Sequence, residues 1–274
     1  MGIFSRNKGV GELVLVFDIG SSSVGGALFW TQKSGITKII FSIRESVTLQ
    51  KTLDLDKFVD LAMKSLDIVA SKIYSAKLGA PSRIFCVLSS PWHISQARVI
   101  NYEKNTPFVF TSKLADDLIK KEVALFEEEY LKKYDGNPVQ AIELKNIKIM
   151  LNGYETRNPL DQKAKQLEMT IFISIAPEQF LNKIRETIRK HFSFEEIKFS
   201  SFVMSSFAVV RDLYIHQENF LLVEIGGEMT DISMVKKNVL CESTSFPLGR
   251  NFIIREVASS LKSSPEEAKS FISL

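Results

Sequence analysis

Two clusters of acidic, glycine and hydroxyl residues in this sequence have the composition of phosphate-binding turns. The first cluster follows an apolar run at residues 14–17, and its members are Asp18, Gly20, Ser21, Ser22 and Ser23. A glycine allows a sharp turn, and serines offer hydroxyl and main-chain N–H donors without bulk. By itself, the segment is as compatible with a simple hairpin turn as with a phosphate-binding corner.

A second cluster of the same kind lies far along the chain. An apolar run at 220–223 leads into an acid, glycines and a hydroxyl residue, and its members are Glu224, Gly226, Gly227, Glu228 and Thr230. Apolar residues then resume, as they do after the first cluster. Because the pattern of acid, isoleucine and glycine occurs twice, the sequence predicts two similar lobes that face one another.

The composition is that of an ordinary globular protein with one or two domains. The chain has 274 residues, of which 45% are hydrophobic and 24% charged. The formal net charge is +3 without a dense basic stripe, so nucleic acid has little support as a partner. Cys86 and Cys241 are isolated in apolar surroundings, which predicts two buried thiols. His93, His191 and His216 lack partners at metal-ligand spacing, and we expect structural or surface roles.

No segment has the character of a membrane span or a signal peptide. The longest uncharged apolar run is shorter than the roughly eighteen residues that a span requires. The leader at residues 1–8 has no apolar core, and Arg6 stands where a myristoylation signal requires serine or threonine. We therefore expect a floppy leader, with membrane contact only through a partner or through a segment absent from this sequence.

Hydrophobic periodicity predicts an α/β fold. Three antiparallel strands start the chain, the third at 36–43, and Asp54 caps a long helix that ends before 79–81. Residues 94–179 read as a compact inserted module of one strand, one helix and two further strands. The helix is expected at 112–133, a loop at 134–138, and the two further strands at 142–150 and 167–175. Later elements alternate in type, with helices expected at 177–191, 201–213, 251–261 and from 265, and strands at 196–199, 220–235 and 239–246.

These motifs resemble the ATPase superfamily of actin, hexokinase and the heat-shock chaperones. Within it they resemble the branch of the bacterial cell-division protein FtsA and its relative PilM. Residues 18–24 are similar to the first phosphate loop, in a form closest to PilM, and 224–232 are similar to the second. Residues 247–253 resemble the segment after that loop, and the turn-rich segment 152–160 resembles the small inserted SHS2 subdomain of the FtsA branch.

The resemblance implies an actin-like (ribonuclease H-like) ATPase fold, which is α/β, with an inserted small α+β subdomain and an incomplete second domain. The first domain (IA) would comprise residues 10–93 plus 180–213, and the insert 94–179. Residues 214–274 would form the start of the second domain (IIA), and we expect the remainder of that domain to lie beyond Leu274.

The same resemblance implies a site for ATP and magnesium. Asp18 and Glu224 match the two acids that hold the magnesium ion of Mg·ATP, usually through waters. The phosphate cradles match Gly20, Ser21, Ser22 and Ser23 in the first loop, and Gly226, Gly227, Glu228 and Thr230 in the second. Backbone N–H donors together with a hard cation on carboxylates suit a triphosphate.

Three departures from the family pattern predict weak or structural nucleotide binding, at most a slow ATPase and no catalytic residue. Gly25 replaces the lysine that contacts phosphate in actin and PilM. Glu228 replaces a glycine, and a carboxylate about 4 Å from a phosphate charge costs roughly 4 kcal/mol at an effective dielectric near 20 if it points inward. The cost mostly vanishes if the side chain turns to solvent or helps to hold the cation. Residues 200–203 lack the carboxylate that could orient an attacking water.

The function implied first is that of an FtsA-like cytoskeletal protein of the cell-division machinery. Such a protein forms filaments and tethers the FtsZ ring to the membrane, in the cytoplasm at the inner face of the cell membrane. The alternative is a PilM-like scaffold of a type IV pilus or secretion assembly, which binds a pilus inner-membrane protein and is favoured by Ser21–Val24. A sugar or acetate kinase would share both loops, but the insert and the lack of a substrate-binding acid cluster disfavour it.

Overall fold

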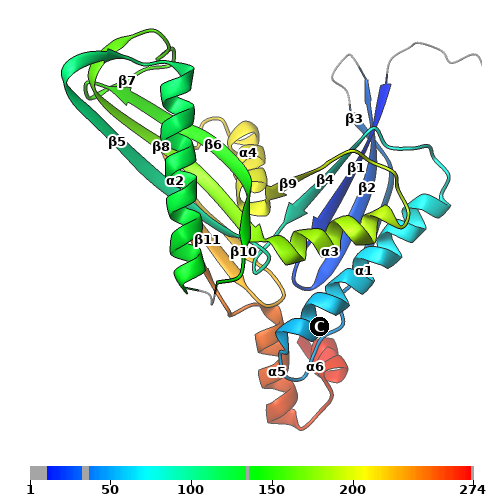
Figure 1. The fold of residues 1–274 in the computed structure, drawn as a ribbon. Helices are drawn as coiled ribbons and strands as arrows, with labels where there is room; N and C mark the ends of the chain where they lie inside the picture. The colour runs from blue at the N-terminus through cyan, green and yellow to red at the C-terminus, as the bar shows by residue number, and fades with distance from the viewer. Residues whose placement is uncertain (1–10, 33–36, 134–135, 273–274) are drawn as a thin grey trace, which may run out of the picture. The chain divides into compact units, whose positions relative to one another are not determined.

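The structure is a computed structural model that describes residues 11–32, 37–133 and 136–272 (Figure 1). The expected leader lies outside the described residues, as do parts of the expected loop at 134–138 and of the expected third strand at 36–43. The chain divides into two compact units, Met1–Val87 with Asn182–Phe199 and Leu88–Leu181 with Ser200–Leu274.

The first unit is organised around a five-stranded sheet with the order β3-β2-β1-β4-β9. Its strands are β1 (Gly11–Ile19), β2 (Ser23–Gln32), β3 (Thr37–Ser46), β4 (Arg83–Leu88) and β9 (Ile197–Ser201). The first three strands form the predicted antiparallel meander, in which Asp18 pairs with Gly25 and Gly25 with Arg44. This register places the first cluster at the end of a hairpin.

Helix α1 (Leu55–Ser75) covers one face of this sheet. Its cap is the predicted one, because the Asp54 carboxylate accepts the Lys57 N–H at 3.0 Å. A Cβ at Gly26 would lie 2.6 Å from side-chain atoms of Val69 and Ile73, so the helix approaches the sheet too closely for a larger residue there. Helix α3 (Glu178–Arg189) leads to a contact with α1, in which His191 Nε2 lies 2.9 Å from the Asp67 carboxylate.

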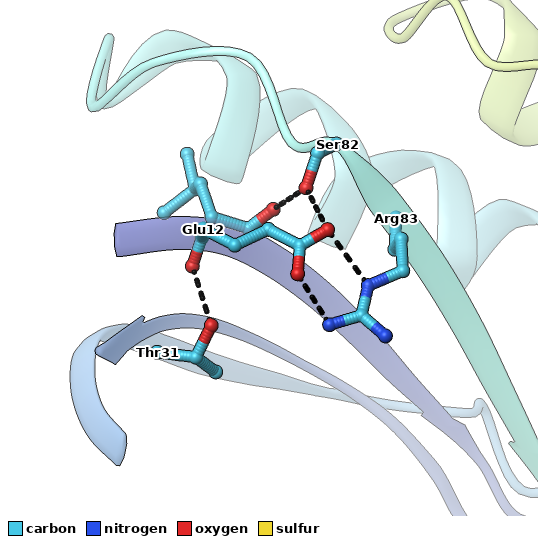
Figure 2. Close-up of polar contacts among 5 residues, drawn as sticks. Glu12, Thr31, Ser82 and Arg83 are labelled. Atoms are coloured by element: carbon cyan, nitrogen blue, oxygen red, sulfur yellow. Dashed lines mark hydrogen bonds and ion pairs between the residues drawn. The ribbon is translucent and has the colours of Figure 1, made fainter. Parts of the chain in front are cut away.

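A polar cluster ties the beginning of β1 to its neighbours, as Figure 2 shows. Ser82 Oγ donates to Glu12 Oε1 at 2.7 Å, and Arg83 Nε donates to the same oxygen at 2.8 Å. The Thr31 hydroxyl of β2 donates to the main-chain carbonyl of Glu12 at 3.1 Å. The Ser82 hydroxyl and the Arg83 guanidinium hold the pKa of the Glu12 carboxyl below its ordinary value, Ser82 having the largest effect. The cluster fixes β1 between β2 and β4.

The second unit contains a four-stranded sheet with the order β5-β8-β6-β7. Its elements are β5 (Ile94–Val109), α2 (Ser112–Lys133), β6 (Val139–Leu151), β7 (Tyr154–Glu155) and β8 (Lys163–Pro177). Phe110, Phe126 and Met169 belong to a buried core between α2 and this sheet. The predicted order of strand, helix and two strands is present, although the strands extend further than expected.

A three-stranded sheet with the order β10-β11-β12 also belongs to the second unit. Its elements and their neighbours are α4 (Phe202–Leu213), β10 (Phe220–Ile225), β11 (Thr230–Lys236), β12 (Val239–Phe246), α5 (Arg250–Leu261) and α6 (Pro265–Ile272). Val235 and Leu240 pack with α4 in a second core that includes Phe172. The second cluster therefore also lies in a hairpin turn.

The thiols and histidines differ partly from expectation. Cys86 is buried as predicted, and burial raises the pKa of its thiol, but Cys241 is only half-buried. His93 is buried and lies 3.0 Å from Ser95 Oγ through Nδ1, and burial lowers its pKa to about 4. Within the described ranges, no helix is long and apolar enough to cross a membrane.

Candidate nucleotide site

The first loop is a tight turn between β1 and β2. Ile19 pairs with Val24, and the N–H of Gly20 donates to the Ser23 carbonyl at 3.0 Å. The Ser22 carbonyl accepts the Val47 N–H at 2.9 Å, which ties the turn to the chain after β3. The structure thus brings Asp18 and the four predicted cradle residues of this loop together.

Arg44 supplies a cation to the first loop from β3. Its guanidinium donates to Asp18 Oδ2 at 2.5 Å and to Ser23 Oγ at 2.8 Å. A Cβ at Gly25 would lie 2.8 Å from Arg44 Nη2, so the guanidinium fills the space beside that glycine. Gly25 replaces the phosphate-contacting lysine of the family, and the structure places a different cation, Arg44, beside it. Sequence reasoning missed Arg44 because only strand pairing brings it opposite Gly25.

The second loop has the same hairpin geometry as the first. Ile225 pairs with Thr230, and the N–H of Gly226 donates to the Met229 carbonyl at 2.9 Å. Glu224, Gly227 and the other predicted residues of this cluster therefore lie in and beside one turn. The similarity of the two loops explains why the same sequence pattern occurs twice.

Glu228 is the residue whose environment differs most from expectation. Its carboxylate is buried, accepts Asn251 Nδ2 at 2.8 Å and pairs with Arg255 Nη2 at 2.5 Å. Both partners lie on α5. The phosphate repulsion expected from a carboxylate at this position is therefore opposed by a guanidinium in direct contact.

The start of α5 packs against the second loop. The N–H groups of Arg250 and Asn251 donate to the carbonyls of Gly226 and Gly227 at 2.9 and 2.8 Å. The Gly249 position has no room for a side chain, because a Cβ would lie 2.3 Å from the Gly227 carbonyl oxygen. Segment 247–253, which the sequence placed after the loop, thus contacts the loop directly.

The side chains of Thr230 and Asp231, at the start of β11, are both hydrogen-bonded to neighbouring segments. Thr230 Oγ1 donates to the Leu248 carbonyl at 2.6 Å, so the hydroxyl is already engaged. Asp231 is buried and accepts hydrogen bonds from the Ser90 hydroxyl at 2.8 Å and from Ser245. Burial raises the pKa of the Asp231 carboxyl, and the two hydroxyls oppose that effect. Asp231 was not among the predicted site residues.

A carboxylate stands at the start of α4, where the sequence showed none. Glu143 of β6 accepts the Ser201 N–H at 3.0 Å and the Ser201 hydroxyl at 2.6 Å, and the Ser200 hydroxyl donates to its other oxygen at 2.8 Å. A carboxylate is favourable at a helix N-terminus. Glu143 therefore stabilises the first turn of α4, and the absence of a carboxylate that could orient an attacking water stays a prediction.

The first loop borders a hollow on the face of the sheet opposite α1. The hollow has a volume of about 500 Å³ and includes Asp18, Gly25, Ala27, Phe29 and Arg44 in its lining. This volume lies within the range of roughly 300–1,000 Å³ that is typical of ligand pockets. Hydroxyl and guanidinium donors beside a carboxylate form a donor set that suits a phosphate with its counter-ion.

No preformed cage of protein ligands for a metal ion is present among the described residues, because no group of three or more His, Cys, Asp or Glu side chains converges there. A magnesium ion bound with phosphates needs only one or two carboxylates. The residues fit Mg·nucleotide in this limited sense, and the roles of Asp18 and Glu224 stay predictions.

Comparison with solved structures identifies proteins of similar fold. The chain is similar to PilM in the structure of the PilM–PilN type IV pilus biogenesis complex, with a TM-score of 0.61 and 14% identity over 94% of this chain and 68% of that chain. The chain has an actin-like ATPase fold.

Other actin-like structures match over most of the chain at lower similarity. A Ppx/GppA family member of Aquifex aeolicus has a TM-score of 0.38 and 14% identity over 95% of this chain and 59% of that chain. A Bacteroides thetaiotaomicron protein of unknown function with an actin-like ATPase fold has a TM-score of 0.41 and 11% identity over 96% and 82%. No protein-family model and no curated protein matches the sequence.

Proposed function

We propose that this chain is a PilM-like scaffold of a type IV pilus or secretion assembly. It acts in the cytoplasm at the inner face of the cell membrane and binds an inner-membrane pilus protein. The observation that carries this proposal is the similarity of fold to PilM over 94% of the chain. The serines and valine at 21–24, which resemble the PilM form of the first loop, support it independently.

The two loops serve, in this proposal, to bind Mg·ATP as a structural ligand with at most slow hydrolysis. Asp18 and Glu224 hold the magnesium ion, which neutralises phosphate charge. The phosphates contact Gly20, Ser21, Ser22 and Ser23 in the first loop, and Gly226, Gly227, Glu228 and Thr230 in the second. Glu228 and Thr230 contribute main-chain groups, because the Glu228 carboxylate is paired with Arg255 and the Thr230 hydroxyl donates to Leu248. Arg44 adds positive charge beside the first loop, and Arg255 neutralises Glu228.

A pull-down with purified proteins tests the scaffold role. The immobilised chain is expected to retain the cytoplasmic tail of a pilus inner-membrane protein from the same organism and not to retain FtsZ. A tail with the same composition in scrambled order serves as the control. Failure to retain the native tail at concentrations of tens of micromolar would contradict the proposal.

The FtsA-like role is the second candidate. Segment 152–160, which resembles the insert of the branch that contains FtsA and PilM, supports it as it supports the PilM-like role. In this case the same experiment retains FtsZ, and the chain self-associates into filaments that sediment and can be seen by electron microscopy. Retention of FtsZ together with filaments would replace the first proposal by the second.

A further inference from the structure

Three residues lie in one row across the strands β1, β2 and β3. Asp18 pairs with Gly25, and Gly25 pairs with Arg44. Side chains of directly paired residues lie on the same face of a sheet, so Asp18 and Arg44 share a face with Gly25 between them. Because Gly25 has no side chain, the middle strand leaves the path between the carboxylate and the guanidinium open.

Gly25 and Arg44 depend on each other sterically. A Cβ at Gly25 would lie 2.8 Å from Arg44 Nη2 and 3.1 Å from its Cζ. The guanidinium thus lies over the middle strand, in the space that a side chain at position 25 would take. Glycine at this position is therefore what allows Arg44 of β3 to reach Asp18 of β1.

The guanidinium holds two side chains of the first loop at once. Nη2 donates to Asp18 Oδ2 at 2.5 Å, and Nη1 donates to Ser23 Oγ at 2.8 Å. The next carboxylate along β3, that of Glu45, is paired with a different cation, Lys72, at 3.1 Å. Arg44 is therefore the cation of Asp18. A guanidinium has five N–H donors, so these two bonds leave further donors for a phosphate oxygen.

A metal ion and this guanidinium would compete for one carboxylate. Magnesium bound with phosphates uses one or two carboxylates, and Arg44 is already in contact with Oδ2 of Asp18. Two cations at the same carboxylate oxygen repel each other. The planar fork of a guanidinium also matches the geometry of a phosphate and binds it directly. The first loop thus carries a counter-ion of its own.

We propose that Arg44 takes the place of the metal ion at Asp18, so that the first loop binds a nucleoside triphosphate free of magnesium. This inference rests on the nucleotide-binding part of the proposed function and specifies the form of the ligand. Magnesium, when present, competes with the guanidinium for Asp18 and adds little to the affinity. Asp18, Gly25 and Arg44 all belong to the first unit, so the arrangement is complete within one sheet.

Titration of the full chain with ATP, with and without the metal, tests this proposal. Isothermal titration calorimetry gives the Kd in millimolar magnesium chloride and in EDTA, and for the wild type the two values are expected to agree within about threefold. For Arg44→Ala, the ratio of the Kd in EDTA to the Kd in magnesium is expected to be at least about tenfold larger, because the metal then supplies the positive charge at Asp18. Lys38→Ala, which removes another basic residue of β3, is the matched control and should keep the wild-type ratio.

The outcomes separate this proposal from the proposed function. Binding by the wild type that is weaker in EDTA by more than about tenfold would overturn the metal-free form of the ligand while leaving nucleotide binding intact. Equal ratios for the wild type and Arg44→Ala would also overturn it. An absence of binding in both solutions would contradict nucleotide binding itself, and this proposal with it. The wild-type comparison requires no variant, and thermal melting checks that Arg44→Ala folds.

Discussion

Two arginines define the candidate site at the scale of single residues. Arg44 reaches Asp18 beside Gly25, and Arg255 reaches Glu228. Arg44 places a positive charge where the family's lysine is missing. Arg255 pairs with the carboxylate that Glu228 adds to the second loop. Charge-assisted hydrogen bonds of this kind are among the stronger ones in proteins. Each loop therefore keeps a positive charge that can oppose the repulsion between its carboxylate and a phosphate.

Removing the cation of the first loop is expected to weaken nucleotide binding. Arg44→Ala should raise the Kd for Mg·ATP by about tenfold or more, because a hydrogen bond to a charged group contributes roughly 1.5–3 kcal/mol. Isothermal titration calorimetry measures the change. Lys38→Ala, on the same strand and exposed, is the matched control. Unchanged affinity in Arg44→Ala would show that this guanidinium does not contact phosphate.

The buried pair in the second loop is expected to matter for stability. Arg255→Met leaves the Glu228 carboxylate buried without its cation and should lower the free energy of unfolding by about 3 kcal/mol. The double variant Glu228→Gln/Arg255→Met should regain most of that loss, since no charge is then buried. Urea denaturation provides the measurement. Equal instability of the single and double variants would mean that packing, and not charge, dominates.

At the scale of elements, the backbone contact between the second loop and α5 leaves no room for a methyl group. Gly249→Ala is expected to destabilise the protein by about 2 kcal/mol, since the added Cβ would meet the Gly227 carbonyl oxygen. Ser259→Ala, on the exposed side of the same helix, is the control. Thermal melting of the two variants compares the effects, and a Gly249→Ala melting curve like that of the wild type would contradict so close an approach of the two backbones.

The cluster that joins β1 to β4 is expected to respond to acid. The pKa of Glu12 is lower in the folded protein than its ordinary value of 4.5, so its contribution to stability is present above that pH. The contribution is lost as the pH falls through the lowered folded value. Urea unfolding from pH 7 to pH 3 should therefore show a smaller loss for Glu12→Gln than for the wild type. Glu266→Gln serves as the control, and parallel pH profiles would contradict the role of Glu12.

At the scale of the whole molecule, nucleotide binding and folding are linked. If the chain binds Mg·ATP, a concentration ten times the Kd stabilises it by about 1.4 kcal/mol, which raises the melting temperature. Differential scanning fluorimetry with millimolar Mg·ATP measures the shift, and magnesium sulfate at equal ionic strength is the control. No shift at several millimolar nucleotide would contradict the binding proposal while leaving the scaffold proposal intact.

Local sequence by itself determined the elements and the two loops. The cap at Asp54, the strand patterns and the glycine turns depend on neighbouring residues, and the structure reproduces them. The actin-like fold was predictable because both hairpins keep their motif.

Tertiary structure decided what those elements contact. Only strand pairing brings Arg44 opposite Gly25, and only the packing of α5 neutralises Glu228. Leu221 and Leu15 are equally apolar in sequence, yet one is exposed and the other buried. Helix α1 covers the face of β1 that carries Leu15. Periodicity along a strand cannot reveal what covers its face.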